Sequence, residues 1–197
     1  VATSDDTSHV TLGSNGSAVF SINPVTLSHG QATVTVHDNK AESLILSAQT
    51  FGGGALSHSG AITISPEVPA GAITFASIVP DSITANGTSL STITSQPVKD
   101  AYGNVVAPLT LIRVTPSLGT VASDDQDPST PLTYERQTAA GGAVSVVIRS
   151  ATSPGSSTVA FQSVTGSASG NATVHFMPAP ACTYAGYLTP CYLVPGD

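Results

Sequence analysis

The stretch Val79–Pro108 reads VPDSITANGTSLSTITSQPVKDAYGNVVAP, and the rest of the chain contains no counterpart to it. The residues that follow this stretch do have an upstream counterpart. One displacement of the sequence along itself places Gly30–Val36 (GQATVTV) on Gly142–Ile148 (GAVSVVI), with apolar residues at alternate positions in both segments. Internal self-similarity of this kind indicates repeated structural modules. We therefore expect two related modules, of which the second includes a segment that the first lacks.

The repeat extends beyond this one segment. The matched pairs are Ile62 with Val174, Ile64 with Phe176, Pro66 with Pro178 and, after a shift of three residues in a loop, Leu44 with Val159 and Leu46 with Phe161. At the same displacement Val1 already falls on Arg113, so the equivalents of roughly Ile73–Ile112 are absent from the first module. The expected organisation is an incomplete module at 1–65, a linker at 66–71, a complete module at 72–178 and a C-terminal tail at 179–197.

The composition and the hydrophobic pattern are those of an all-β protein. Of 197 residues, 18 are Gly and 14 Pro, which suits many turns, and no segment has the period of a helix. The expected strands are Ala18–Ile22, Gln31–Val36, Ser43–Ala48 and Ala61–Ile64 in the first module, and Ile73–Ile78, Ser91–Val98, Leu109–Thr115, Pro131–Arg136, Ala143–Arg149, Thr158–Val164 and Ala172–Phe176 in the second. Seven strands in about 105 residues is the count of an immunoglobulin-like β-sandwich. The expected fold is two such modules in tandem, the first without its N-terminal strands.

Turn motifs in the second module carry a family resemblance. Pro80–Ser89 (PDSITANGTS) places an Asn-Gly-Thr-Ser turn before a strand, and Val98–Ala107 (VKDAYGNVVA) places a Lys-Asp-Ala-x-Gly-Asn turn after it. With Gly30–Val36, these motifs resemble bacterial Ig-like domains of the invasin/intimin type, although Pro97 departs from the usual pattern. The resemblance covers nearly all of the second module and the latter two-thirds of a domain in the first. It implies rigid spacer domains of surface adhesins, and hence an extracellular, bacterial cell-surface location.

Charge and hydropathy exclude several classes of partner. The chain has five Lys and Arg against twelve Asp and Glu, a net charge of −7, and no basic run, so we expect no nucleic-acid partner. Its longest apolar runs, such as Ala143–Ile148, are far shorter than the ~20 residues of a membrane span. The sequence contains no signal-peptide pattern, so an exported chain would be processed or part of something longer.

No residue pattern indicates a catalytic or cofactor site. The five His are scattered without an HExxH pair, and no Gly-x-Ser-x-Gly elbow precedes a helix. The acidic turns Asp124–Asp127 (DDQD) and Asp5-Asp6 offer oxygen ligands of the kind that calcium prefers, but solvated loop acids are the preferred interpretation. We therefore expect no enzyme activity, no cofactor and no metal.

Both cysteines lie in the C-terminal tail. Cys182 and Cys191 are predicted to form a disulfide, with free thiols as the alternative, because their spacing suits neither a zinc motif nor a redox CxxC. A bridge implies an oxidising compartment and contributes about 2–3 kcal/mol on the chain-entropy model. Tyr184, Tyr187 and Tyr192 crowd into the same tail, for packing or for docking on a neighbour.

The missing strands lead to two hypotheses of function. Their absence removes about six inward side chains, worth about 10 kcal/mol of burial, and it opens a groove for a partner strand. The predicted groove residues are Val34, Val36, Leu44, Leu46, Ile62 and Ile64. The first hypothesis is a subunit of a surface filament or pilus-like assembly whose first module is completed by strands of another protein chain. The alternative is a stalk fragment of an invasin/intimin-like cell-surface adhesin.

Overall fold

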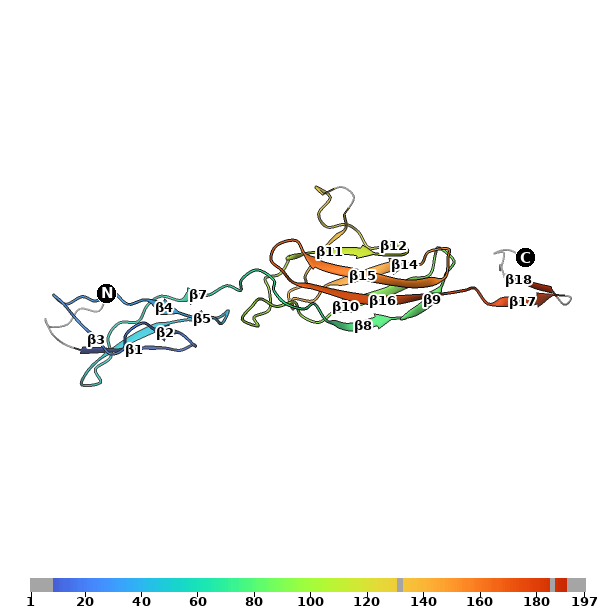
Figure 1. Cartoon of the computed structure of the whole chain (residues 1–197). Coiled ribbons are helices and arrows are strands. Elements are labelled where there is room, and N and C mark those ends of the chain that lie inside the picture. Colours follow the sequence, from blue (N-terminus) through green and yellow to red (C-terminus); the bar gives the residue numbers. More distant parts are fainter. Residues whose placement is uncertain (1–8, 131–132, 185–186, 191–197) are drawn as a thin grey trace. The chain divides into compact units, whose positions relative to one another are not determined.

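The chain folds into β-strands throughout the part that the structure describes. The computed structural model describes residues 9–130, 133–184 and 187–190, and it divides the chain into two compact units, Val1–Pro66 and Glu67–Asp197 (Figure 1). Every regular element in these described residues is a strand, which confirms the all-β prediction. The described residues include no helix that is long and apolar enough to span a membrane.

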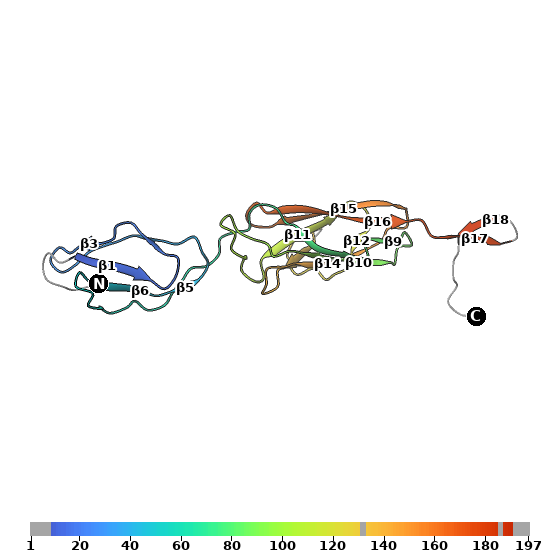
Figure 2. The same cartoon turned by 90° about the horizontal axis from the view of Figure 1, so that it is seen from below.

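The two larger sheets of the second unit lie between Phe75 and Met177. A four-stranded sheet has the order β12-β14-β10-β8, and a five-stranded sheet has the order β13-β11-β15-β16-β9 (Figure 2). The strands are β8 (Phe75–Val79), β9 (Ser82–Thr84), β10 (Leu90–Ser95), β11 (Leu111–Pro116), β12 (Thr120–Val121), β13 (Glu135–Gln137), β14 (Ser145–Arg149), β15 (Gly155–Ser163) and β16 (Ser169–Met177). The pairing of β16 with β9 is parallel and the other pairings are antiparallel.

Alternating side chains of both sheets fill the interior of this unit. The residues that alternation predicts to be buried are at most 2% exposed: Val144, Val146, Ile148, Val159, Phe161, Val174 and Phe176. They belong to a cluster of eighteen buried hydrophobic residues. Phe75 of β8 packs edge-on against Phe161 of β15, with ring centroids 4.9 Å apart. The predicted interior of the second unit is thus confirmed.

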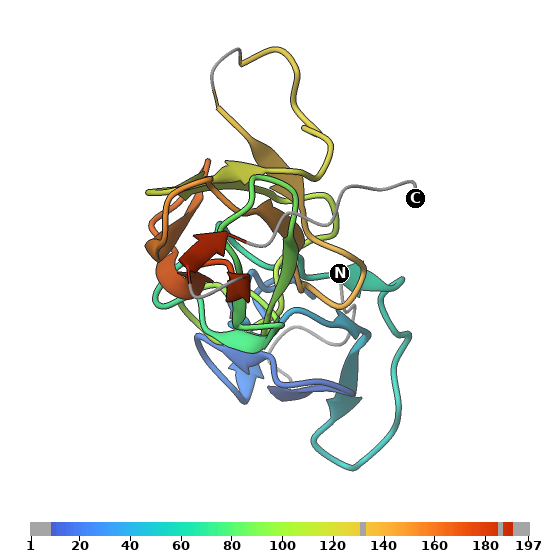
Figure 3. The ribbon, with the colours of Figure 1, turned by 90° about the vertical axis from the view of Figure 1, so that its right-hand side faces the viewer.

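Some short strands of this unit differ from the prediction. The sequence does not predict β9 and β12, because elements of three and two residues are too short to show an alternation. Of the strand expected at Pro131–Arg136, residues 131–132 lie outside the described residues, and the described strand β13 begins at Glu135. Asp125 ties β13 to the loop after β12, because its Oδ1 accepts hydrogen bonds from the backbone N–H groups of Asp127 and Glu135. This loop projects from the unit between β12 and β13 (Figure 3).

The first unit is a smaller arrangement of short strands. Its sheets are three-stranded, in the order β3-β1-β6, and two-stranded, β2-β4 and β5-β7. The strands are β1 (His9–Ser14), β2 (Val19–Phe20), β3 (Val25–Thr26), β4 (Val36–His37), β5 (Ser43–Leu44), β6 (Leu46–Thr50) and β7 (Ile62–Thr63). The sequence analysis predicts no strand at β1 or β3, because β1 ends in the turn-forming residues Gly13-Ser14 and Asn23-Pro24 lies directly before β3.

The last described element is a hairpin in the C-terminal tail. β17 (Ala181–Tyr184) pairs antiparallel with β18 (Tyr187–Pro190). Cys191 lies outside the described residues, so the disulfide between Cys182 and Cys191 stays a prediction.

Candidate strand-acceptor groove

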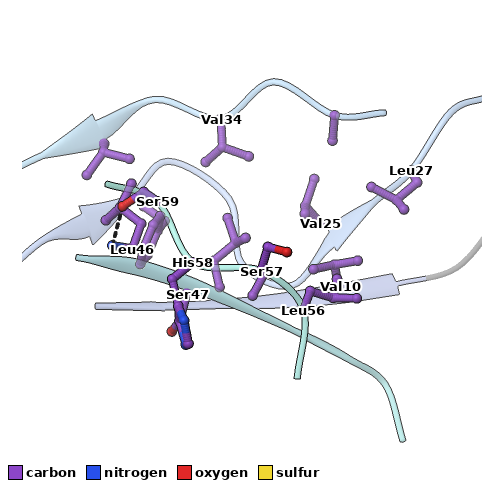
Figure 4. A pocket seen from close by; sticks show the side chains of 15 residues that line it. Val10, Val25, Leu27, Val34, Leu46, Ser47, Leu56, Ser57, His58 and Ser59 are labelled. Atoms are coloured by element: carbon purple, nitrogen blue, oxygen red, sulfur yellow. Dashed lines mark hydrogen bonds between the residues drawn. The ribbon is translucent and has the colours of Figure 1, made fainter. Parts of the chain in front are cut away.

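An apolar groove lies in the first unit. It has a cavity volume of about 420 Å³, and its walls come from β1, β2, β3, β4, β6 and the segment before β7. Figure 4 shows Val34 on one wall pointing toward Val10 and Leu46 on the strands opposite. The lining residues are Val10, Leu12, Phe20, Val25, Leu27, Ala32, Val34, Val36, Leu46, Ser47, Ala48, Leu56, Ser57, His58 and Ser59.

The structure brings three of the six predicted groove residues together. Val34, Val36 and Leu46 line the groove. Leu44 is 1% exposed but is not part of the lining, and Ile62, its partner across the β5-β7 pair, is 38% exposed. Ile64 is half-buried and also lies outside the lining.

A loop accounts for the burial of Leu44. A Cβ built on Gly16 would lie 3.3 Å from the Leu44 Cβ, so the loop after β1 covers this side chain. Glu42 holds the loop: its Oε1 accepts hydrogen bonds from Ser17 N at 2.6 Å and from Ser17 Oγ at 2.7 Å. The hydrogen bond with Lys40, followed by those from Ser17, lowers the pKa of Glu42 to about 2. The carboxylate of Glu42 therefore stays charged at neutral and mildly acidic pH, where it accepts the hydrogen bonds that hold the loop over Leu44.

Sequence reasoning missed the wall formed by β1. Val10 and Leu12 alternate with polar residues in His9–Ser14, which is the signal of a half-buried strand. Leu56 and Leu27 have no such signal, because both lie in loops that hydrogen bonds shape. Leu56 N, for example, donates to Ala48 O at 2.9 Å.

The strand pairings of the first unit reproduce those of the second. Phe20 pairs with Val36 as Val121 pairs with Ile148. In the same way, the register of β1 on β6 matches that of β11 on β15, and the register of β5 on β7 matches that of β15 on β16. These registers align Leu44 with Ser157, so the loop before this strand is one residue longer in the second unit. The sequence comparison assumed a loop three residues longer, and its pairing of Leu44 with Val159 and of Leu46 with Phe161 is therefore wrong.

The correspondence links the groove to the interior of the second unit. Eight lining residues fall on members of the buried cluster of the second unit. The pairs are Val10 with Ile112, Leu12 with Val114, Phe20 with Val121, Ala32 with Val144, Val34 with Val146, Val36 with Ile148, Leu46 with Val159 and Ala48 with Phe161. In the second unit these positions are at most 8% exposed. In the first unit, six of the eight line an open groove and are only half-buried: Leu12, Phe20, Ala32, Val34, Val36 and Leu46.

One wall of the groove has an unpaired backbone edge. β14 lies between β12 and β10, whereas β4, which corresponds to it, pairs only with β2 within the described residues. The segment Ala32–Val34, separated from β4 by Thr35, makes no backbone hydrogen bond to the described part of the chain. Such an edge is a template for an added strand.

The acidic turn and the histidines form no metal site among the described residues, where no group of three His, Cys, Asp or Glu side chains is placed to hold an ion. The carboxylates of Asp125 and Asp127 accept hydrogen bonds within their own loop, as solvated loop acids do. His175 Nδ1 lies 2.9 Å from Ser156 Oγ on the neighbouring strand. Asp5-Asp6 lies outside the described residues.

Solved structures with a similar fold include adhesin domains. The D0-D1 domain of intimin is 22% identical with a TM-score of 0.40, over 88% of this chain and 83% of that chain. InvD of Yersinia pseudotuberculosis is 20% identical with a TM-score of 0.42, over 90% of this chain and 49% of that one. These structures agree with the invasin/intimin resemblance of the turn motifs.

An enzyme also contains a region of similar fold. A glycosyl hydrolase family 2 member from Bacteroides cellulosilyticus is 18% identical with a TM-score of 0.43, over 86% of this chain but only 21% of that chain. The chain thus spans about a fifth of the hydrolase. Neither protein-family models nor curated proteins give a match.

Proposed function

We propose that this chain is a non-enzymatic structural segment of a bacterial cell-surface adhesin stalk, and that its first unit is an Ig-like module completed by β-strands from elsewhere. The observation that carries the proposal is the correspondence between groove and core. Positions that β8 and β10 help to cover in the second unit have equivalents in the first unit, and these equivalents line an open groove. The invasin/intimin resemblance supports the extracellular setting and the spacer role.

The two units differ sharply in the core that each provides. The second unit buries a cluster of eighteen hydrophobic residues, whereas the main cluster of the first unit consists of Val10, Val25, Leu27 and Ala48. Ordering each residue costs about 1–2 kcal/mol of backbone entropy, which burial of apolar surface must offset. A four-residue cluster offsets little of this cost over the whole first unit. Strands that fill the groove would supply the missing burial.

Hydrogen exchange on the isolated 197-residue chain tests the proposal. We expect the amides of Ala32, Thr33 and Val34 to exchange almost as fast as those of an unfolded peptide, because no strand covers this edge. The amides of Val146 and Ile148 in the second unit serve as the internal reference and should be strongly protected. Protection of Val34 equal to that of Val146 in a monomeric chain would contradict the proposal.

The open edge also favours a second candidate function. In a filament or pilus-like assembly, a neighbouring chain would donate the strand, and its backbone hydrogen bonds would give affinity along Ala32–Val34. Both candidates use the same groove. They differ in whether the donor strand and this chain belong to one polypeptide.

A further inference from the structure

We infer that the strands that fill the groove have the chemistry and register of this chain's own β8 and β10, with an inward apolar residue opposite Val34 and a large apolar side chain against Ala48. The inference rests on the proposed function and adds the identity of the occupant. It follows from the second unit, where strands of this kind are seen on the equivalent wall.

The register of β10 on β14 predicts the register of the occupant on the first unit. Ile93 pairs with Val146, and both side chains are fully buried. Val34 is the equivalent of Val146, so the occupant places an apolar residue opposite Val34. Thr92 and Thr94, on either side of Ile93, are only half-buried. The occupant is therefore an antiparallel strand that alternates apolar and polar residues.

The backbone around Ala32 fits this strand. In the second unit Ser95 N donates to Val144 O at 2.9 Å, and Val144 N donates to Ser95 Oγ at 3.0 Å. Ala32 corresponds to Val144, and its N–H and C=O make no backbone hydrogen bond within the described residues. An occupant in the same register satisfies these groups, which the groove would otherwise leave unpaired beside apolar side chains.

The size of the groove residues predicts a bulky side chain from the second strand of the occupant. In the second unit Phe75 of β8 packs against Phe161. Ala48 stands in the position of Phe161, so the first unit has a methyl group where the second has a ring; the ring of Phe20, which also lines the groove, stands at the position of Val121. The occupant must fill that space as well as the space that Phe75 fills, because voids in a protein interior forfeit packing contacts. A phenylalanine or leucine at the position of Phe75 satisfies this need better than alanine.

Other occupants fit the groove less well. A small apolar ligand would leave the backbone of Ala32–Val34 unpaired. A second copy of the first unit offers only the same open edge, and its small Ala48 and Ala32 would face the same residues across the interface. A strand pair like β8 and β10 satisfies both the unpaired edge and the apolar walls.

A fusion that restores the order of the second unit tests the inference. β1 corresponds to β11 with His9 at the position of Leu111, so counting back along the sequence aligns Val1 with Gly103. The sequence displacement, which aligned Val1 with Arg113 and counted Leu111 and Ile112 among the absent residues, is wrong for this part of the chain. A second copy of residues 72–102 joined directly to Val1 of the full chain therefore gives the native spacing between β10 and the strand that follows it. We expect the amide protection of Val34 to rise by roughly 100-fold or more over the unfused chain.

Two variants of the added copy test the register. Ile93→Asp in the copy places a charge opposite Val34 and should abolish the gain in protection. Thr92→Asp is the matched control, because Thr92 is half-buried on the opposite face of the strand, and the gain should persist. Protection of Val146 in the second unit shows in every variant that the rest of the chain is folded.

The outcomes separate the inference from the proposed function. If Val34 exchanges freely in both the unfused and the fused chain, the groove is open but the occupant is of another class, and the inference is wrong while the proposed function stands. The inference is also wrong if both aspartate variants keep the gain, or if Val34 becomes protected in the unfused chain only at high concentration, which would indicate a second copy as the occupant. Protection in the dilute, unfused monomer contradicts the proposed function itself.

Discussion

At the scale of single residues, the buried carboxylate of Glu135 ties the projecting loop of the second unit to β11. Glu135 is 0% exposed, and its Oε1 accepts a hydrogen bond from Arg113 Nε at 2.9 Å. Its Oε2 accepts hydrogen bonds from the hydroxyl groups of Thr130 and Thr133 at 2.9 and 3.1 Å. Both oxygens of a buried carboxylate are thus satisfied, and the loop before β13 is tied to β11.

Arg113→Met should destabilise the second unit, because it leaves the buried Glu135 carboxylate without its counter-charge. Breaking a buried pair costs about 3–5 kcal/mol. We expect about 2–4 kcal/mol here, since the Arg113 side chain is 39% exposed and water can partly replace it. Urea unfolding of the second unit measures the loss. Arg149→Met, at an exposed position on β14, is the matched control and should change stability by less than about 0.5 kcal/mol. Equal effects of the two substitutions would refute the role of the pair.

At the scale of elements, the segment expected to be a linker is bound to the second unit. Pro69 is buried, Ala70 N donates to Lys99 O at 2.9 Å, and Ser167 N donates to Pro69 O at 2.9 Å. A Cβ on Gly166 would collide with Pro69 O, so glycine is needed at this close approach. The segment after Pro66 is therefore an ordered edge of the second unit.

Asp100, in the Lys-Asp-Ala-x-Gly-Asn turn, holds the segment after Pro66 in place through hydrogen bonds. It is 4% exposed, and its Oδ2 accepts hydrogen bonds from Glu67 N at 3.0 Å and from Asn104 Nδ2 at 2.9 Å. Its Oδ1 accepts from the backbone N–H groups of Tyr102 and Asn104, both at 2.9 Å. Burial alone would raise the pKa of Asp100, but the hydrogen bonds from Asn104, Glu67 and Tyr102 outweigh it and hold the pKa below the ordinary 3.8.

Asp100→Ala should loosen this edge and cost about 2–4 kcal/mol, because it leaves several backbone N–H groups without an acceptor. Faster hydrogen exchange at Glu67 and a lower urea midpoint measure the effect. A lowered folded-state pKa stabilises the fold above the ordinary pKa of 3.8 and loses this contribution as pH falls through the folded value. The difference between wild type and Asp100→Ala should therefore shrink below about pH 4. Asp81→Ala, at an exposed position, serves as the control, and a pH-independent difference would contradict the charge assignment.

The elements also show what the sequence could and could not predict. β14, β15 and β16 follow from long alternating runs, and their inward residues are correctly predicted. β4 is shorter than its alternating run because no strand pairs with Ala32–Thr35 among the described residues, and strand pairing is not encoded in the local sequence. The groove itself depends on loops such as Leu56–Ser59, whose position is set by hydrogen bonds, for example Ser59 N to Leu46 O, that no pattern indicates.

At the scale of the whole molecule, the two units differ in how completely their apolar side chains are covered. The second unit contains its own β8, β9 and β10 and a closed core, so it can fold without help. The first unit reproduces the pairings of β11 to β16 but presents the surface that β8 and β10 would cover. Under the proposed function, the remaining question is whether those strands belong to this polypeptide or to another.

The adhesin-stalk proposal predicts that the donor strands and this chain are covalently continuous in the native protein. Denaturing electrophoresis of cell-envelope material, with an antibody against the second unit, tests this, and the recombinant 197-residue chain provides the size marker. We expect one band larger than the marker, because a donor on the same polypeptide remains attached when hydrogen bonds and apolar contacts are lost. The gel is run with reductant, so that a disulfide through Cys182 or Cys191 cannot mimic continuity. A band that comigrates with the marker, accompanied by a second protein that copurifies only under native conditions, would instead establish donation in trans, as the filament candidate requires.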